Sequence, residues 1–365
     1  MKSAQRILAI VRKEVRQLRR DRLTFGMIVG IPVIQLLMFG YAINMDVRHL
    51  DAALADMSGT SASRQMVMDM QQTQVIRITT QAADAAELEK LLRQGRISVG
   101  IYIPPDFDIH MQRGDRSAAQ LLVDGSDTVV QSAAAQLAQI SGHARVSPYN
   151  DRPPAVELRT YFNPERRSPV NTVPGLIGVI LTMTMILFTA VAIVRERERG
   201  NLEMLITTPV KTSELMLAKI IPYIFIGLIQ VSLVLLLGHF LFEVPMAGSL
   251  RDTYLITLVF IVANLALGLL ISTAVSTQFQ AMQLTFFILL PSILLSGFMF
   301  PFAGMPRPAQ LIAEALPLTH FNRLIRGVML RGASLEELSG ELLILAGFIV
   351  VLMFLAIMRF SKRLD

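Results

Sequence analysis

Charged residues of alternating sign lie between two long uncharged stretches of this chain. Residues 173–194 and 220–242 contain no Asp, Glu, Lys or Arg, and each is long enough to cross a bilayer at about 1.5 Å rise per residue. The segment between them, 195–219, is therefore a short charged loop beside the membrane. A loop of this kind can bind a charged groove of a partner protein. A solvated helix end with i,i+4 charge pairing shows the same pattern.

No residue pattern in this chain is typical of an active site. Asp124 and Asp127 could be a metal-binding pair, but a turn with Asp127 as a helix N-cap is the favoured interpretation. His49, His110 and His143 are dispersed, without the spacing of a metal motif. The sequence has no cysteine and no G-x-x-x-x-G-K-[ST] phosphate loop. We therefore expect a non-catalytic chain with no cofactor or metal of its own.

Polar side chains inside uncharged stretches are further candidates, because burying them without a partner is costly. Gln35, Gln230 and Asn264 are predicted to line a substrate path. A hydrogen bond to a neighbouring helix is the alternative role for Gln230. His239, near the end of the same stretch, is another candidate for substrate contact.

Two glycines point to close packing of helices. Gly26 and Gly30 form a G-x-x-x-G pair, which lets two helices approach each other closely. We predict that this pair lies at an interface between two subunits. Local packing, or a kink together with Pro32, is the alternative.

The composition indicates an integral membrane protein. Of 365 residues, 53% are hydrophobic and 17% are charged, and the mean hydropathy is +0.51, which is too apolar for an ordinary soluble protein of this length. The net charge is +6, but the basic residues cluster beside apolar stretches, as the positive-inside rule expects. We therefore predict contact with membrane lipids and no binding of nucleic acid.

The hydrophobic pattern predicts an α-helical membrane protein with six transmembrane helices. Residues 1–22 carry an apolar stripe beneath a basic face and are predicted to form an interfacial helix, a solvated basic leader being the alternative. Residues 23–43 contain 21 uncharged residues, more than the core of a signal peptide, and form the first span. The later spans are predicted at 173–194, 220–242, 254–275, 282–300 and 342–358, followed by a tail at 359–365.

An α/β domain is predicted at 44–168, inserted between the first two spans. Its short apolar segments predict strands at 52–55, 74–78, 97–103 and 119–123 and helices at 61–72, 82–94 and 128–140. Alternation of this kind favours a mixed or parallel sheet. The proline-rich residues 145–169 are interpreted as a linker back to the membrane.

Residues 301–340 are too polar to span a membrane and too apolar for a free loop. Short interfacial or re-entrant helices on the outer side fit this pattern. Ser334 and Glu337 have the spacing of a capping box that starts the next helix.

Basic residues predict the orientation. With the N-terminus in the cytoplasm, the inner segments carry sixteen Lys and Arg beside the spans, whereas the short outer loops carry five. This distribution satisfies the positive-inside rule. Both termini and the 195–219 loop are thus predicted inside, and 44–168 outside.

This topology excludes several classes of function. The inner segments are too short for the output module of a sensor. Apart from His239, the spans lack the ionisable groups with which a secondary transporter couples an ion gradient. A pore-forming subunit driven by a separate motor protein remains. A non-transporting scaffold, or a receptor with an outer ligand-binding domain, is the alternative from another class.

Two groups of motifs resemble the permeases of ABC-2 type exporters. The first comprises Arg195-Glu196-Arg197-Glu198-Arg199-Gly200-Asn201-Leu202-Glu203 and Thr207-Thr208-Pro209-Val210. The second comprises Phe302-Ala303-Gly304-Met305-Pro306, Leu316-Pro317-Leu318-Thr319-His320-Phe321 and Arg326-Gly327-Val328-Met329-Leu330-Arg331-Gly332. The resemblance covers nearly the whole chain, and is closest to the bacterial multidrug branch with a large extracytoplasmic domain.

The resemblance implies how the work is divided between subunits. A separate ABC ATPase would bind ATP and Mg²⁺, and a second permease, identical or related, would complete the path through the bacterial inner membrane. Residues 1–22 would be the connecting helix, and a periplasmic adaptor protein is a further expected partner. The implied cargo is amphiphilic and drug-like, with a lipid or cell-envelope precursor as the alternative. The residues implied to couple to the ATPase are Arg195, Glu196, Glu198, Arg199, Gly200, Glu203 and Pro209.

Overall fold

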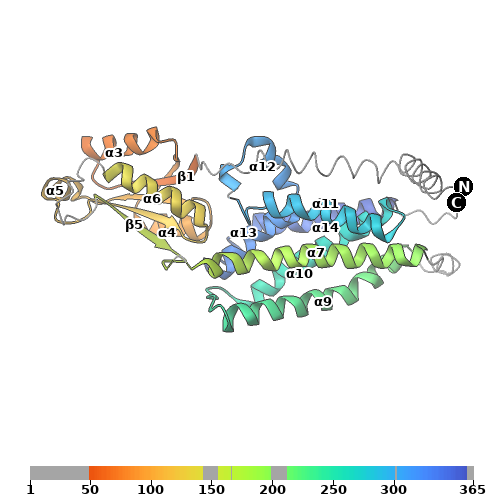
Figure 1. The fold of residues 1–365 in the computed structure, drawn as a ribbon. Coiled ribbons are helices and arrows are strands. Elements are labelled where there is room, and N and C mark those ends of the chain that lie inside the picture. Colours follow the sequence, from red (N-terminus) through yellow and green to blue (C-terminus); the bar gives the residue numbers. More distant parts are fainter. Residues whose placement is uncertain (1–48, 143–154, 166, 199–211, 301, 360–365) are drawn as a thin grey trace, which may run out of the picture.

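The computed structural model describes residues 49–142, 155–165, 167–198, 212–300 and 302–359. It shows an α/β domain at one end of a group of long helices (Figure 1). The predicted interfacial helix 1–22, the first span 23–43 and the tail from residue 360 lie outside the described residues. So do Gln35, Gly26 and Gly30, which belong to the first span.

The α/β domain is present, as the alternating pattern predicted. Its strands are ordered β2-β1-β3-β4-β5 in one sheet, and all neighbours are parallel except the antiparallel pair of β3 and β4. The elements in chain order are β1 (Leu50–Asp56), α3 (Ser61–Gln72), β2 (Ile76–Gln81), α4 (Ala85–Arg93), β3 (Val99–Ile103), α5 (Phe107–Arg113), β4 (Ala119–Asp124), α6 (Thr128–Gly142) and β5 (Val156–Tyr161).

Helices cover both faces of this sheet. Successive residues of a strand point to opposite faces, so Leu121 packs with Met70 of α3 and Leu137 of α6, whereas Leu122 packs with Leu88 of α4. All five of these side chains are almost completely buried. The domain therefore has three layers and a core of its own.

Two elements of the domain differ from the sequence prediction. β5 lies within residues 145–169, which were interpreted as a linker, and pairs in parallel with β4 so that Leu158 is opposite Leu121. The prolines before it suggested an irregular segment, but a six-residue edge strand is fixed by its pairing partner more than by local propensity. The short helix α5 was not predicted, because only Phe107 and His110 of it are buried.

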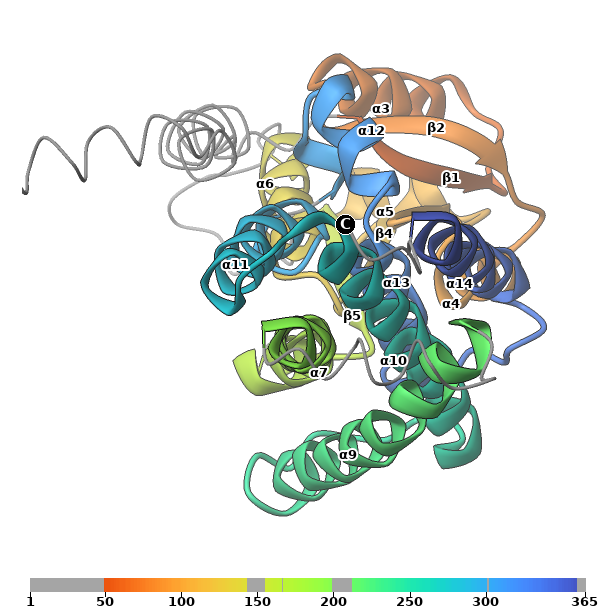
Figure 2. The ribbon, with the colours of Figure 1, turned by 90° about the vertical axis from the view of Figure 1, so that its right-hand side faces the viewer.

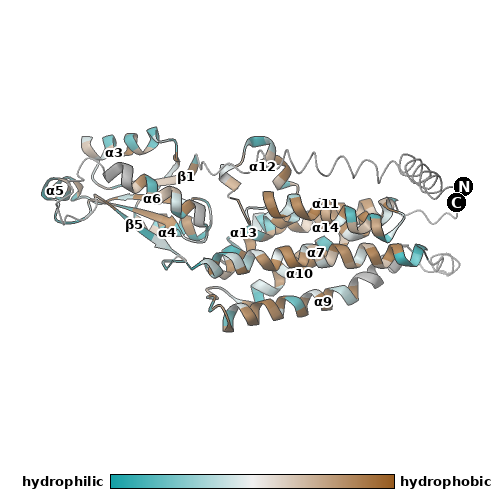
Figure 3. Ribbon diagram, viewed as in Figure 1, coloured by the Kyte–Doolittle hydropathy of each residue, from teal (hydrophilic) through white to brown (hydrophobic). Residues whose placement is uncertain are grey.

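Five helices among the described residues are long and apolar enough to cross a membrane. Figure 3 shows their apolar colouring along the bundle. α10 and α7 are the most enclosed, with 67% and 56% of their apolar windows buried, against 11% for α14. Figure 2, seen from the end of the bundle, accordingly shows α10 in the middle. The five are α7 (Ser168–Glu198), α9 (Thr212–Phe240), α10 (Leu250–Ala274), α11 (Gln278–Leu295) and α14 (Ser339–Arg359).

The helices differ in length from the predicted spans. α7 continues through the charged residues to Glu198 and α9 already begins at Thr212, so both enter the predicted 195–219 loop. Uncharged stretches mark the apolar part of a helix, while Arg, Glu and Lys are good helix formers beyond it. α11 ends at Leu295, before the predicted position 300, and Gly297 follows with a positive φ of 78°. Only glycine adopts that conformation without strain.

Short helices occupy the segment between α11 and α14. They are the 3₁₀ helix η2 (Phe302–Gly304), α12 (Arg307–Glu314) and α13 (Pro317–Met329). α13 is buried within the protein, where Phe321 stacks on Phe260 of α10 with ring centroids 4.0 Å apart. It also packs closely on α7, because a Cβ at Gly178 would lie within 3 Å of Leu318 and Phe321.

The predicted capping pair of Ser334 and Glu337 is present. The Ser334 N–H donates to the Glu337 carboxylate at 3.1 Å, and the Glu337 N–H donates to the Ser334 hydroxyl at 3.4 Å. The pair closes a turn at 335–338 and not the first turn of a helix as predicted, and α14 begins directly after that turn at Ser339.

Candidate functional site

Three of the seven predicted coupling residues lie at the end of α7 that points away from the α/β domain (Figure 1). Arg195, Glu196 and Glu198 belong to the last turns of this helix. Arg199, Gly200, Glu203 and Pro209 lie outside the described residues.

A tight turn connects α10 to α11 beside this helix end. The Thr277 side chain accepts a hydrogen bond from the Gln280 N–H at 3.2 Å, and the Gln280 side chain accepts one from the Thr277 N–H at 3.4 Å. This reciprocal pair is a capping box, which satisfies free N–H groups at a helix start. Only residues 275–277 join the two helices.

Side chains of α7 bind both sides of that turn. Arg197 donates to the carbonyl oxygens of Ser272 and Val275 at 3.1 and 3.0 Å. The Glu198 carboxylate accepts from the Gln278 N–H at 2.9 Å and also from the Gln278 side-chain amide. We call this contact of Arg197 and Glu198 with residues 272–278 the turn clamp.

The charges of the turn clamp match the helix ends that they meet. Carbonyl groups at the end of α10 carry partial negative charge and face Arg197, whereas N–H groups at the start of α11 carry partial positive charge and face Glu198. Arg195 adds a longer bond from Nε to the Gln278 side-chain oxygen at 3.4 Å. The sequence pattern singled out Arg195 and Glu198 but not Arg197 as coupling residues.

Two of the predicted substrate-path residues are described, and the structure does not bring them together. Gln230 of α9 accepts a hydrogen bond from Thr184 of α7 at 2.9 Å, which is the alternative considered for it. Asn264 of α10 is buried and donates to the carbonyl of Phe260 at 2.9 Å. Both side chains tie helices or helix turns together.

An apolar cavity of about 370 Å³ lies where α9, α10 and the start of α7 meet near the α/β domain. This volume falls in the range of about 300–1,000 Å³ for small-molecule pockets. His239 lines it, whereas Gln230 and Asn264 do not. Its polar groups include a hydrogen-bonded pair, Ser232 and Tyr254, 2.7 Å apart. The apolar residues along its wall include Val173, Leu235, Phe240, Leu250 and Met329.

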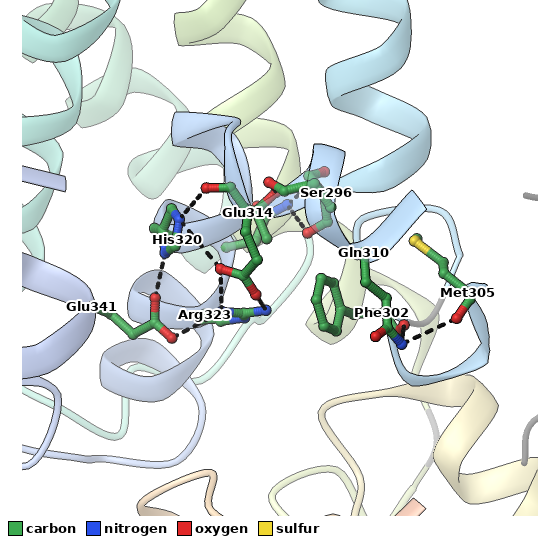
Figure 4. A network of polar contacts seen from close by, with 11 residues as sticks. Ser296, Phe302, Met305, Gln310, Glu314, His320, Arg323 and Glu341 are labelled. Carbon is green, nitrogen blue, oxygen red and sulfur yellow. Dashed lines mark hydrogen bonds and ion pairs between the residues drawn. The ribbon is translucent and has the colours of Figure 1, made fainter. Parts of the chain in front are cut away.

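Four charged side chains meet where α12, α13 and α14 converge (Figure 4). We call Glu314, His320, Arg323 and Glu341 the polar quartet. Arg323 bridges both carboxylates, at 2.6 Å to Glu314 and 3.0 Å to Glu341, and lies 4.5 Å from the Phe302 ring centroid. His320 is 1% exposed, with Nδ1 2.5 Å from Glu341 and Nε2 2.9 Å from the Glu314 carbonyl.

The surroundings of His320 favour the doubly protonated imidazole. Each ring nitrogen faces an oxygen that accepts hydrogen bonds, so both nitrogens donate when both are protonated. Burial lowers the pKa of His320, but the hydrogen bonds to Glu341 and to the Glu314 carbonyl outweigh it and raise the pKa overall. The quartet then holds two positive and two negative charges.

Polar side chains also join the α/β domain to the segment that follows α13. Arg331, just after α13, lies 3.5 Å from the Asp124 carboxylate at the end of β4, and both side chains are nearly buried. Glu337 receives a hydrogen bond from Gln94 at 3.4 Å and lies 3.7 Å from Arg93. The α/β domain is therefore fixed to the segment between α13 and α14 at two points.

Asp124 and Asp127 have the roles expected of a turn. The Asp127 carboxylate accepts from the Val130 N–H at 3.4 Å at the start of α6, and Asp124 accepts from the Ser126 N–H at 2.9 Å. No group of three or more His, Cys, Asp or Glu suited to a metal ion occurs among the described residues.

Sequence reasoning missed the polar quartet and Arg331. Glu314, His320 and Arg323 recur at six- and three-residue intervals in an apolar segment, and a buried charge requires a partner. That rule alone indicates an ion-pair network near α13. It does not identify Glu341, which is 21 residues from His320.

Known proteins and a protein family match this chain over nearly its full length. The family described as ABC-2 family transporter protein matches residues 22–358. A protein named probable multidrug ABC transporter permease YbhS, from Escherichia coli K12, is 31% identical over 372 residues, covering 100% of this chain and 98% of the relative. The probable multidrug ABC transporter permease YbhR of the same organism is 26% identical, covering 91% of both chains.

A more distant relative has a similar length. The linearmycin resistance permease protein LnrN of Bacillus subtilis is 21% identical and covers 95% of this chain and 97% of its own. With a family match over more than nine-tenths of the chain and five apolar helices in the described part, the protein is a multi-pass membrane permease of the ABC-2 transporter family.

Proposed function

We propose that this chain is the membrane-spanning subunit of an ATP-driven exporter that moves amphiphilic, drug-like molecules out of the cytoplasm or the inner leaflet. The observation that carries the proposal is the full-length similarity to permeases named for multidrug transport, at 31% identity. The name of LnrN, a linearmycin resistance permease, supports outward movement of a toxic compound. The apolar cavity beside α9 supports an amphiphilic cargo.

The energy source is a separate ABC ATPase that binds ATP and Mg²⁺. The chain itself has no phosphate loop. Its coupling segment begins at Arg195 and includes Glu196, Glu198, Arg199, Gly200, Glu203 and Pro209. When the ATPase pair closes on ATP, the docked segments move and the permeases open toward the outside.

The proposed assembly contains two permeases, identical or related, in the bacterial inner membrane. The five apolar helices and the predicted span 23–43 give six spans with both termini in the cytoplasm. The α/β domain then lies outside, where it can meet a periplasmic adaptor protein. Gly26 and Gly30 are the proposed contact between the permeases, and membrane lipids cover the remaining apolar surface.

Affinity purification from gently solubilised membranes tests the proposal. We expect one ABC ATPase subunit to accompany each permease, and ATP hydrolysis to depend on the phosphate-loop lysine of that partner. Recovery of the permease from repeated extractions without any ATPase would contradict the proposal, and would favour a scaffold or receptor role. Strong ATP hydrolysis by the permease alone would contradict it as well.

A further inference from the structure

The turn clamp joins three helices at the end of the bundle opposite the α/β domain. Arg197 holds the carbonyl end of α10 and Glu198 holds the N–H end of α11. Only Val275, Ser276 and Thr277 separate these helices. A force on that turn therefore acts on both α10 and α11.

The packing next to the clamp is close enough to carry such a force. A Cβ at Gly268 of α10 would lie 2.8 Å from the Ile186 carbonyl oxygen of α7, so the two backbones are nearly in contact. Ala190 of α7 also belongs to one buried cluster with Ile271 of α10 and Ala281 of α11. Closely packed interiors transmit displacement because they compress little.

The clamp is also next to the proposed ATPase contact in the sequence. Glu198 is followed directly by the remaining coupling residues, beginning with Arg199. Movement of the docked segment reaches α7 and α9, the two helices that flank it, and α7 carries the clamp. The clamp adds directed hydrogen bonds to the packed side chains and to the longer Arg195–Gln278 bond through which α7 also meets α10 and α11.

We infer that Arg197 and Glu198 are positioning residues that transmit movement of the ATPase-docked segment to the α10–α11 turn, so that α7, α10 and α11 move as one unit. This inference rests on the proposed function. It assigns Glu198 a role within the permease that is distinct from contact with the ATPase.

The test compares the amount of an amphiphilic fluorescent dye transported per ATP hydrolysed, using the complete permease and ATPase complex in proteoliposomes. Arg197→Met removes the guanidinium and keeps an apolar stem, whereas Glu198→Ala removes the carboxylate. Glu198→Gln keeps a hydrogen-bond acceptor and is the conservative variant. Phe279→Ala is the matched control, because Phe279 follows Gln278 directly but is 63% exposed.

We expect Arg197→Met and Glu198→Ala to lower the transport ratio by about five-fold or more, the lower end of allosteric coupling effects. ATPase recovery and basal ATP hydrolysis should remain normal in Arg197→Met, because Arg197 is not one of the proposed ATPase-coupling residues. Glu198→Gln should keep most of the dye transported per ATP, and the control should match the wild type. A purely structural defect would reduce the amount of assembled complex and leave the ratio unchanged.

Gln278→Ala removes the side-chain bond to Glu198 and keeps the backbone N–H bond, and together with Glu198→Ala it completes a double-mutant cycle. The two substitutions remove partners of one contact, so their effects should not add. The double variant Glu198→Ala with Gln278→Ala should transport no less dye per ATP than the worse of the two single variants. If Glu198→Ala fails to assemble, Gln278→Ala provides the comparison. An unchanged ratio in Arg197→Met and Gln278→Ala, or fully additive losses, would overturn the inference while leaving the proposed function intact. No ATP-driven transport by the wild-type complex would overturn both.

Discussion

His320 on α13 places Nδ1 2.5 Å from the carboxylate of Glu341 at the start of α14. The same imidazole is 1% exposed, and Arg323 connects Glu341 to Glu314 on α12. Three helices that follow one another in the chain are thus held by two cations and two anions. This arrangement allows charged groups to be buried beside apolar helices, because each charge has partners of the opposite sign.

Glu341→Gln should destabilise the permease by about 2 kcal/mol, because it leaves His320 and Arg323 with one carboxylate between them. Reversible unfolding in mixed detergent micelles, followed by circular dichroism, measures the free energy. Glu314→Gln is the matched control and should cost less, because Glu314 is 40% exposed and Glu341 only 25%. Equal free energies of unfolding for Glu341→Gln and the wild type would show that the quartet does not stabilise the fold.

The stability provided by the quartet should depend on pH. The pKa of His320 is raised in the folded protein, so the stabilising charged form is fully present below the ordinary value of about 6.5. Stability should decline as the pH rises through the folded-state pKa. Unfolding of His320→Gln should lack this decline at the same pH values. A wild-type protein that gains stability over that range would contradict the assignment.

Arg331→Met should loosen the attachment of the α/β domain. The variant leaves Asp124 without its partner and removes the guanidinium that lies over Gly95. Hydrogen exchange of the intact permease should become about ten-fold faster at 93–95 and 124–127, corresponding to roughly 1.4 kcal/mol.

Arg77→Met is the control for that experiment. It breaks an ion pair with Asp51 in the same domain, but both side chains are about half exposed, and exposed ion pairs contribute little. Exchange at 93–95 should therefore stay unchanged in this variant. Equal effects of the two substitutions would argue against a specific junction at Arg331.

The fold was predictable from sequence where the pattern is local. Uncharged stretches predicted the five described spans, and alternating short segments predicted the α/β domain. β5 was missed because its stability depends on β4, which no local pattern reveals. The helix ends beyond the membrane were missed because charged residues such as Glu198 continue a helix without an apolar signal.

The candidate sites were less predictable because their contacts are distant in sequence. Glu198 meets Gln278 across 80 residues, and Arg331 meets Asp124 across 207. Charge alternation indicated that Glu198 is functional, but it could not show which groups its carboxylate contacts. His320 lies in a recognisable motif, yet its carboxylate partners come from two other helices.

Glu203→Arg should weaken docking of the ATPase. Charge reversal in the proposed coupling segment replaces attraction by repulsion where the partner groove is basic. The measurement is the amount of ATPase recovered with the purified permease at low and high salt. Glu89→Arg makes the same change on an exposed position of α4 and should recover ATPase as the wild type does. Full recovery with Glu203→Arg at both salt concentrations would exclude this residue from docking.

Dye transport by reconstituted proteoliposomes tests the central claim most directly. Permease and ATPase are inserted together with the ATPase facing the bath, and uptake of an amphiphilic dye is followed after ATP and Mg²⁺ are added. We predict ATP-dependent uptake only when both proteins are present, and none when the phosphate-loop lysine of the ATPase is replaced. Absence of ATP-dependent uptake by the intact complex across a panel of amphiphilic dyes, or equal uptake by the permease alone, would contradict the account.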